Sequence, residues 1–196
     1  YYFVREMSFG QDGNFSWESM VDRYNVDLAN DFGNLASRVL SMATRYLDGV
    51  VPDGPSGDDL TDADRSLREV HSAALADMER AVDDIAPHEA LRAAWRFVGA
   101  CNAYVEDAAP WKLAKDPDAR RRLEVVLYVL LDSLRELALM TSPITPKAAQ
   151  ELWERLGLEG RVDAQTFASD VRLVAGGKVR TGDPLFPRLD DPSPVS

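Results

Sequence analysis

The feature that most constrains the fold is an amphipathic helical pattern that runs from about residue 17 to residue 47. At roughly 100° per residue, one polar stripe of this helix contains Arg23, Asn30, Asn34, Arg38 and Arg45. The apolar side chains fall together elsewhere on the helix, and they are Trp17, Val21, Tyr24, Leu28, Phe32, Leu35, Val39, Met42, Ala43 and Tyr46. Because such a helix buries its apolar side, we expect Asn34 and Arg38 to point away from the core.

Further helical segments follow, and several have recognisable ends. The expected helices after the first cover residues 61–85, 87–108, 119–140 and 146–156, with a short one near 164–171. Thr61 and Asp64 form an acidic capping box, Pro87 suits a first helical position, and Pro110 ends the helix before it. The 52–59 segment is too poor in apolar residues to pack, so we expect a surface loop there. The pattern predicts an all-α fold, an antiparallel helical bundle.

The two ends of the chain are less regular. The glycines of residues 8–14 predict a turn-rich stretch, and Ser16 is a plausible N-cap for the long helix after it. Near the C-terminus we expect a turn at Gly176 and Gly177 and a tail, residues 184–188, that docks on the bundle. The apolar pattern is already under way at Tyr1, without an initiator Met, so we expect a piece of a longer protein.

Composition limits the possible functions. The chain has 33 acidic and 22 basic residues, a formal net charge of −11, which disfavours non-specific binding to nucleic acids or anionic membranes. Any nucleic-acid contact must therefore be local. The single Cys101 cannot form an intrachain disulfide, and no apolar run reaches the ~18 residues of a membrane span. We expect a cytoplasmic protein.

Patterns typical of enzyme active sites are absent from the sequence. It contains no phosphate-binding loop, no dinucleotide-binding glycine motif and no HExxH zinc motif. The two histidines, His71 and His88, have no ligand spacing to each other or to the cysteine. Adjacent carboxylates lie at loops and helix ends, where a solvated surface is the ordinary interpretation. We therefore expect no catalytic residue and no metal site in this chain.

Three residues suggest a binding surface instead. Asn34 offers a donor and an acceptor, and Arg38 offers a planar set of donors, so the two could recognise base edges or phosphates. Trp111 lies at the helix break fixed by Pro110 and could stack on a base. A structural interpretation remains open, in which Asn34 and Arg38 pair with Asp27 and Asp31 on a solvated face and Trp111 caps the core.

Three segments resemble the C-terminal part of bacterial methionyl-tRNA synthetases. They are REMSFGQDGNFS at residues 5–16, RYNVDLANDFGNLASR at residues 23–38 and APWKLAK at residues 109–115. The end of the fourth helix, Ser-Pro-Ile-Thr-Pro at 142–146, and the tail at 184–188 also resemble that family. The first two motifs together are highly specific, and the resemblance covers nearly the whole chain.

The resemblance implies a helical bundle of the class I synthetase anticodon-binding type, which recognises the CAU anticodon of the initiator and elongator methionine tRNAs. Asn34 and Arg38 match the asparagine and arginine of the family's Asn-Leu-x-x-Arg motif, which contact the first anticodon base, a cytosine. Trp111 matches the tryptophan that stacks with the anticodon, and Pro110 would hold its loop.

The resemblance also implies a division of the chain and of the enzyme. Residues 1–15 would end a stem-contact connector, residues 16–160 would form the anticodon-binding bundle, and residues 161–196 would form a short helix and a docking tail. The family's HIGH and KMSKS sequences, its use of ATP with Mg²⁺ and its zinc-binding insertion would belong to an upstream catalytic domain. We expect no cofactor in this chain, which alone should be inactive.

The expected partners are the anticodon stem-loop of tRNA(Met) and the upstream catalytic domain, with no membrane and no DNA. An acidic domain that binds tRNA needs a local positive face. Arg45, Lys112 and Lys115 could supply it by contacting the tRNA backbone, with further help from the three arginines at 120–122. Positive charges at the start of a helix are unfavourable for the helix dipole, which favours an external anionic partner for these arginines. A solvated face is the alternative role.

Two other hypotheses remain open at this point. A helical protein-interaction or scaffold module without RNA binding would share the fold, and it would keep a protein partner but bind no tRNA. The equivalent domain of a synthetase for another amino acid would also share the bundle. The combination of Asn34, Arg38 and Trp111 disfavours that second alternative.

Overall fold

The structure, a computed structural model, describes residues 1–7, 15–168 and 171–190. Its helices are α1 (Tyr2–Glu6), α2 (Trp17–Arg23), α3 (Asn34–Leu47), α4 (Asp62–Asp83), α5 (Pro87–Ala108), α6 (Pro110–Leu113), α7 (Arg120–Thr141) and α8 (Pro146–Arg155). A π-helix, Tyr24–Gly33, joins α2 to α3, and short 3-10 turns lie at Gly57–Asp59, Pro117–Ala119 and Val162–Ala164. Within the described residues the β pairing is limited to one isolated bridge, between Val50 and Lys178. The predicted all-α bundle is confirmed.

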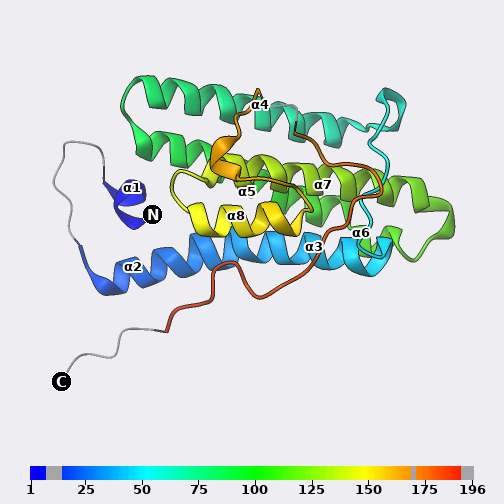
Figure 1. Ribbon diagram of the computed structural model, residues 1–196, viewed down its shortest axis with the longest axis horizontal. Helices are drawn as coiled ribbons and strands as arrows, with labels where there is room; N and C mark the ends of the chain where they lie inside the picture. The colour runs from blue at the N-terminus through cyan, green and yellow to red at the C-terminus, as the bar shows by residue number, and fades with distance from the viewer. Residues whose placement is uncertain (8–14, 169–170, 191–196) are drawn as a thin grey trace.

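The bundle is organised around α7. This helix packs against α3, α5, α6 and α8, and most of its side chains are buried. α4 and α5 form a long antiparallel hairpin on one side of it, and the continuous rod of α2, the π-helix and α3 lies on the other (Figure 1). No helix in the described part of the chain is both long and apolar enough to cross a membrane.

The predicted helix starts are confirmed in detail. The Ser16 hydroxyl accepts a hydrogen bond from the Ser19 backbone N–H at 3.0 Å, as an N-cap does. Thr61 and Asp64 form the expected reciprocal capping box at the start of α4. Pro87 and Pro146 are the first residues of α5 and α8. These local rules therefore place the ends of the helices correctly.

The long helical run is continuous, but it is not a single α-helix. Its central ten residues are a π-helix, in which hydrogen bonds join residues five apart; the Asn34 backbone N–H thus donates to the Ala29 carbonyl. Gly33 suits this winding, because a Cβ there would lie 2.9 Å from the Leu28 carbonyl oxygen. This winding departs from the 3.6 residues per turn on which the predicted polar stripe was based, and the five residues of that stripe are all exposed or half-buried.

Trp17 is the clearest error in the predicted core. Its side chain is 62 % exposed and contacts the ring of Phe15, with centroids 5.1 Å apart. Phe15 in turn stacks on Phe3, which is also exposed. Trp17 therefore belongs to a surface cluster of aromatic residues near the N-terminus and not to the core.

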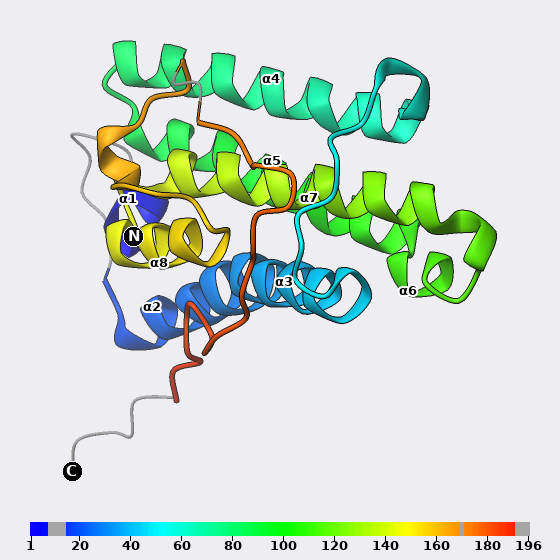
Figure 2. The same cartoon turned by 45° about the vertical axis from the view of Figure 1, so that its right-hand side comes forward.

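The C-terminal segment docks on the bundle as predicted. After α8 it rises toward α4 and then returns past α7 to the rod of α2 and α3 (Figure 2). Phe186 is buried against Phe32, with ring centroids 5.8 Å apart, and the Asn25 side chain donates to the Leu189 carbonyl at 2.8 Å. A turn occurs at Ala175 and Gly176, close to the predicted position.

Two terminal predictions have different outcomes. The short helix predicted near residues 164–171 is wrong, because only the single 3-10 turn Val162–Ala164 forms and residues 165–168 are not helical. Few apolar side chains are available there to stabilise a helix on the bundle. The turn-rich stretch predicted for residues 8–14 lies outside the described residues.

Candidate nucleic-acid interface

The turn between α5 and α6 brings Trp111 to the side of α3. Ala109 has a left-handed backbone, with φ of 43°, which ends α5, and Pro110 then starts α6. Trp111 is therefore the second residue of a four-residue helix instead of a loop residue. The guanidinium carbon of Arg38 lies 5.9 Å from the centroid of the Trp111 ring. Two residues far apart in the sequence thus meet at one place.

The Trp111 side chain has two surroundings. It is half-buried and packs against the hydrophobic core, yet one part of its ring contacts the exposed Arg38 guanidinium. A cation near an aromatic ring is attracted to its π face. The structural interpretation from the sequence is therefore partly correct, since the residue contacts the core. Its role as a stacking surface for a base stays a prediction.

Arg38 does not pair with the acidic residues of its own helical rod. Its Nη2 donates to Glu106 Oε1 on α5 at 2.5 Å, and the two side chains are 41 % and 59 % exposed. Asp27, the partner considered from the sequence, is buried and bonded instead to Tyr1 and Arg5. Exposed ion pairs stabilise a fold by only about 0–1 kcal/mol, so this pair can open at little cost.

Asn34 lies one turn before Arg38 on α3, and its side chain is exposed. Within residues 1–7, 15–168 and 171–190 its amide has no hydrogen-bond partner. Behind it, Gly33 leaves space for the Phe186 ring, whose nearest atom would lie 3.6 Å from a Cβ on that glycine. The docked tail therefore supports the start of α3 from the core side, and the Asn34 amide remains available for a ligand.

The other candidate contacts are also on the surface. Arg45, Lys112 and Lys115 are exposed, and none of them has an acidic partner among the described residues. Arg45 lies over the Tyr46 ring, 5.7 Å from its centroid. Pro110 is buried and forms the first turn of α6. These positions are compatible with the predicted roles but do not test them.

The three consecutive arginines at the start of α7 are paired within the protein. Arg120 bonds to Glu124 at 2.7 Å, Arg121 to Asp59 at 2.7 Å, and Arg122 to the buried Asp64 at 2.6 Å. Arg121 and Arg122 thus join α7 to the segment before α4 and to α4 itself. The suggestion that these two form an external positive face is wrong, because internal carboxylates already neutralise them.

Two residues of this surface were not predicted from the sequence: Glu106, which pairs with Arg38, and Tyr46, which lines a hollow with Arg45. Glu106 lies on the exposed side of α5 five residues before Trp111, and only the tertiary fold shows that it reaches Arg38. Tyr46 was assigned to the core, but it is half-buried and lines a surface hollow with Arg45. The single basic residue near the end of α3, Arg45, was the available signal for this site.

The described residues contain few other groups that suggest a functional site. Among the described residues, no three or more His, Cys, Asp or Glu side chains gather in a way that could hold a metal ion. Cys101 is buried, and burial raises the pKa of its thiol to about 12, so it remains protonated at neutral pH. The surface of α3 and α6 is therefore the strongest candidate site in the described structure.

Two protein-family models match this chain. The model described as the anticodon binding domain of methionyl tRNA ligase matches residues 54–194. A second model, described as tRNA synthetases class I (M), matches residues 1–40. The two matches together cover nearly all of the chain.

Curated proteins and solved structures agree with the family models. The methionine–tRNA ligase of Streptomyces coelicolor is 38 % identical over 97 % of this chain, and that of Bacillus subtilis is 36 % identical over 97 %. The free Mycobacterium tuberculosis methionyl-tRNA synthetase superposes with a TM-score of 0.88 at 37 % identity, over 97 % of this chain. The chain spans only 37 %, 28 % and 38 % of these three proteins, respectively.

Proposed function

Because the chain belongs to the anticodon-binding domain family of methionyl tRNA ligases, we propose that it recognises tRNA(Met) through the CAU anticodon. It would do so as the C-terminal part of a methionine–tRNA ligase. The observation that carries the proposal is the meeting of Arg38 with Trp111 beside the unpartnered amide of Asn34. A stacking ring, a fork of donors and an amide within one small area are the groups needed to bind a single unstacked base.

The chemistry of cytosine matches these groups. Its Watson–Crick edge carries an amino donor and two acceptors, the ring N3 and the carbonyl oxygen. The Arg38 guanidinium can donate to the acceptors, and the Asn34 carbonyl oxygen can accept from the amino group. Uracil replaces the amino donor with an acceptor, to which a turned Asn34 amide could donate, but it also replaces the N3 acceptor with an N–H donor, which then faces the Arg38 donors. The proposed site therefore favours cytosine at the first anticodon position by a difference in hydrogen bonding.

Trp111 supplies the stacking surface in this proposal. Stacking of a base on an aromatic side chain contributes about 1–3 kcal/mol. The position of the ring is fixed by Pro110 and by its core contacts, so little conformational freedom is lost on binding. The four-residue α6 thus acts as a rigid mount for the ring.

Glu106 is the residue that RNA must displace. While it is paired with Arg38 at 2.5 Å, the guanidinium donors are partly occupied. The pair is exposed on both sides and costs little to open, and a base edge then replaces the carboxylate. An unpaired Glu106 would repel a nearby phosphate. RNA that offers Arg38 no hydrogen bonds in place of the carboxylate should therefore bind more weakly.

The proposal also explains how an acidic domain can bind RNA. Arg38, Arg45, Lys112 and Lys115 are exposed cations on or beside α3 and α6. Most of the other guanidiniums in the described residues are engaged by carboxylates, as in Arg121 with Asp59. Three cations without an acidic partner among the described residues, Arg45, Lys112 and Lys115, therefore lie near the candidate site despite the net charge of −11.

We further propose that the upstream part of the enzyme catalyses the ATP-dependent joining of methionine to tRNA. The ATP, the Mg²⁺ and any zinc would be bound there, and this chain alone would be inactive. Arg5 on α1 bonds to the buried Asp27 at 3.0 Å, and Arg23 bonds to Glu6 at 2.6 Å. These contacts hold the connector against the bundle and would fix the direction from which the upstream part arrives.

The test is binding of the 196-residue chain to RNA stem-loops with the anticodon CAU or with a changed first base, at one stated salt concentration. We expect the CAU stem-loop to bind about tenfold or more tightly than the UAU stem-loop. Equal affinities would refute the proposal. Binding of a protein partner without any tRNA binding would favour the scaffold hypothesis instead.

A further inference from the structure

A hollow lies beyond Arg38 along α3, between the last turn of that helix and the start of α7. Its volume is about 380 Å³, which is within the range of ligand sites. Its lining includes the side chains of Arg45, Tyr46, Leu113, Asp116, Pro117 and Arg120. The hollow therefore combines an aromatic and aliphatic wall with two guanidiniums at its rim.

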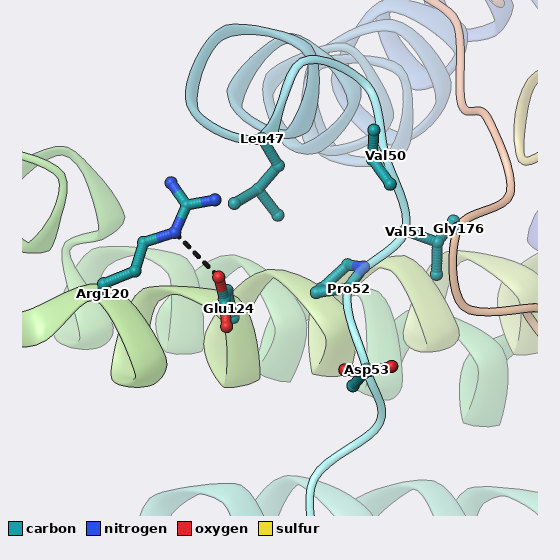
Figure 3. Close-up of a pocket in the computed structure, with 8 residues that line it drawn as sticks. All are labelled: Leu47, Val50, Val51, Pro52, Asp53, Arg120, Glu124 and Gly176. Carbon is teal, nitrogen blue, oxygen red and sulfur yellow. Dashed lines mark hydrogen bonds and ion pairs between the residues drawn. The ribbon is translucent and has the colours of Figure 1, made fainter.

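The two guanidiniums are positioned by the protein itself. Arg45 lies over the Tyr46 ring at 5.7 Å from the centroid. Arg120 Nη1 donates to the Tyr46 carbonyl at 3.0 Å, and its Nε donates to Glu124 at 2.7 Å. Figure 3 shows Arg120 and Glu124 on α7, joined by this ion pair, where they line a neighbouring hollow with Leu47 and Val50. Both cations are thus held near one tyrosine.

The charged groups at the rim are not all paired. Glu124 pairs with Arg120, whereas the Asp116 carboxylate accepts a hydrogen bond from the Asp118 backbone at 3.0 Å and keeps its negative charge. Arg45 has no acidic partner in the part of the chain that the structure describes. Because an exposed, unpaired guanidinium attracts phosphate, Arg45 is the strongest anion contact of the hollow.

The hollow continues the surface that carries the proposed cytosine site. Arg38 and Arg45 are seven residues apart on α3, which is two turns and about 10 Å along the axis. Leu113 belongs to the same short helix as Trp111. An RNA strand that places one base between Asn34, Arg38 and Trp111 would therefore pass over the hollow with its neighbouring nucleotide.

We propose that this hollow holds another nucleotide of the anticodon, the one adjacent to the first anticodon base. Its base lies against the wall of Tyr46, Leu113 and Pro117, and its phosphate faces Arg45 with support from Arg120. The proposal rests on the proposed function, because the strand is guided there by its neighbour. It assigns to Arg45 and Tyr46 a nucleotide contact that is separate from recognition of the first base.

The first experiment measures binding of the CAU stem-loop to the full 196-residue chain and to its Arg45→Ala variant. We expect the variant to bind about tenfold more weakly. The slope of log K against log salt should fall by about 0.7, as for one lost phosphate contact on a single strand. Preference for CAU over UAU should be unchanged, because Asn34 and Arg38 are not altered.

The matched control is Arg92→Ala. Arg92 is also an exposed arginine, on α5, about 24 Å along the helix from its C-terminal end. This variant should leave both the affinity and the salt slope unchanged. Equal losses in Arg92→Ala and Arg45→Ala would show a general effect of net charge and would overturn the proposal.

The second experiment locates the nucleotide with stem-loops that lack one anticodon base at a time. Removal of the base that occupies the hollow should weaken binding to the unaltered chain about tenfold. A Tyr46→Leu chain should be nearly insensitive to the same removal. Because Tyr46 also touches the core, Arg45→Ala provides the test that does not depend on its folding.

The outcomes separate the two proposals. If Arg45→Ala and Tyr46→Leu bind as the unaltered chain does, and that chain prefers CAU, the hollow holds no nucleotide and the proposed function stands. If the unaltered chain has no preference for CAU, both proposals fail. Loss of first-base preference in Arg45→Ala would also overturn the inference, because the hollow would then not be a separate site.

Discussion

Two carboxylate–guanidinium pairs of this protein differ in almost every physical respect. Asp64 on α4 is fully buried and binds Arg122 at 2.6 Å, together with the Tyr104 hydroxyl and the Thr61 cap. Glu106 and Arg38 also form a short pair, yet both side chains are exposed, and within the described part of the chain neither makes a second side-chain hydrogen bond.

The difference shows which pair belongs to the fold and which to the surface. The Asp64 cluster joins α4, α5 and α7, and its charges cannot be separated without leaving a carboxylate in the interior. The Arg38–Glu106 pair joins α3 to α5 at the edge of the candidate site, where water can replace either partner. The Asp64–Arg122 ion pair therefore stays closed in the folded protein, whereas the Arg38–Glu106 ion pair can open and be replaced by a ligand.

The largest effect is expected when the buried pair is broken. Asp64→Asn removes the charge that neutralises Arg122 and should lower the free energy of unfolding by about 3–5 kcal/mol. Urea unfolding followed by circular dichroism measures this change. The matched control is Asp62→Asn, at an exposed position in the first turn of the same helix, which should cost less than about 1 kcal/mol. Similar losses for the two variants would contradict the comparison.

Acid should weaken the buried pair by a smaller amount. Burial favours the neutral Asp64, but hydrogen bonds from Arg122, Tyr104 and Thr61 outweigh it and lower the pKa of the carboxyl well below its usual range. The stability that it supplies is thus complete above about pH 4, the ordinary range of an unfolded aspartate, and is lost as the pH falls further.

Urea unfolding of the unaltered chain and of Asp64→Asn at pH 7 and pH 3 measures this dependence. The gap in unfolding free energy between the two should narrow at pH 3, because the Asp64 carboxylate of the unfolded chain binds protons there while that of the folded chain stays ionised. A gap that widens on acidification would mean that the pKa of Asp64 is raised by folding and not lowered.

At the exposed site, the largest effect should come from the stacking ring. Trp111→Ala should weaken binding of the CAU stem-loop by about 1–3 kcal/mol while the protein stays helical. Trp111→Tyr keeps a stacking face and should recover most of the loss. A collapse of helicity in Trp111→Ala would instead assign the residue to the core alone.

The smallest effect should come from opening the exposed pair. Glu106→Gln frees Arg38 and removes a negative charge near the RNA, so binding of the CAU stem-loop should become tighter by up to about 1 kcal/mol. Stability should change by no more than that. Asp107→Asn removes the same charge at the next exposed residue of α5 and serves as the control; equal tightening in both would indicate only long-range repulsion.

Local sequence rules predicted much of the fold for definable reasons. The capping residues Ser16, Thr61 and Asp64 and the prolines that start α5 and α8 act on their own neighbours, so the helix ends could be placed without the tertiary structure. The π-helix could not be predicted, because every angular argument assumed 3.6 residues per turn. The exposure of Trp17 could not be predicted either, because it shares a face of α2 with the buried Val21 and only the tertiary structure shows that the first turn contacts Phe15 instead of the core.

The candidate site was predictable only in part. Exposure of Asn34 and Arg38 follows from the pattern of α3 itself, and the motif resemblance connected them to Trp111. The pairing of Arg38 with Glu106, 68 residues away, depends on how α5 is packed beside α3. The hollow of Arg45, Tyr46 and Arg120 likewise forms only when α7 meets the end of α3.

The most direct test of the central claim is a thermodynamic cycle between Arg38 and the first anticodon base. Affinities of the unaltered chain and of Arg38→Ala are measured for the CAU and UAU stem-loops at the same salt concentration. We predict that the preference of the unaltered chain for CAU, about tenfold or more, falls to nearly one in Arg38→Ala. An unchanged preference in the variant would show that Arg38 does not recognise that base and would contradict the account.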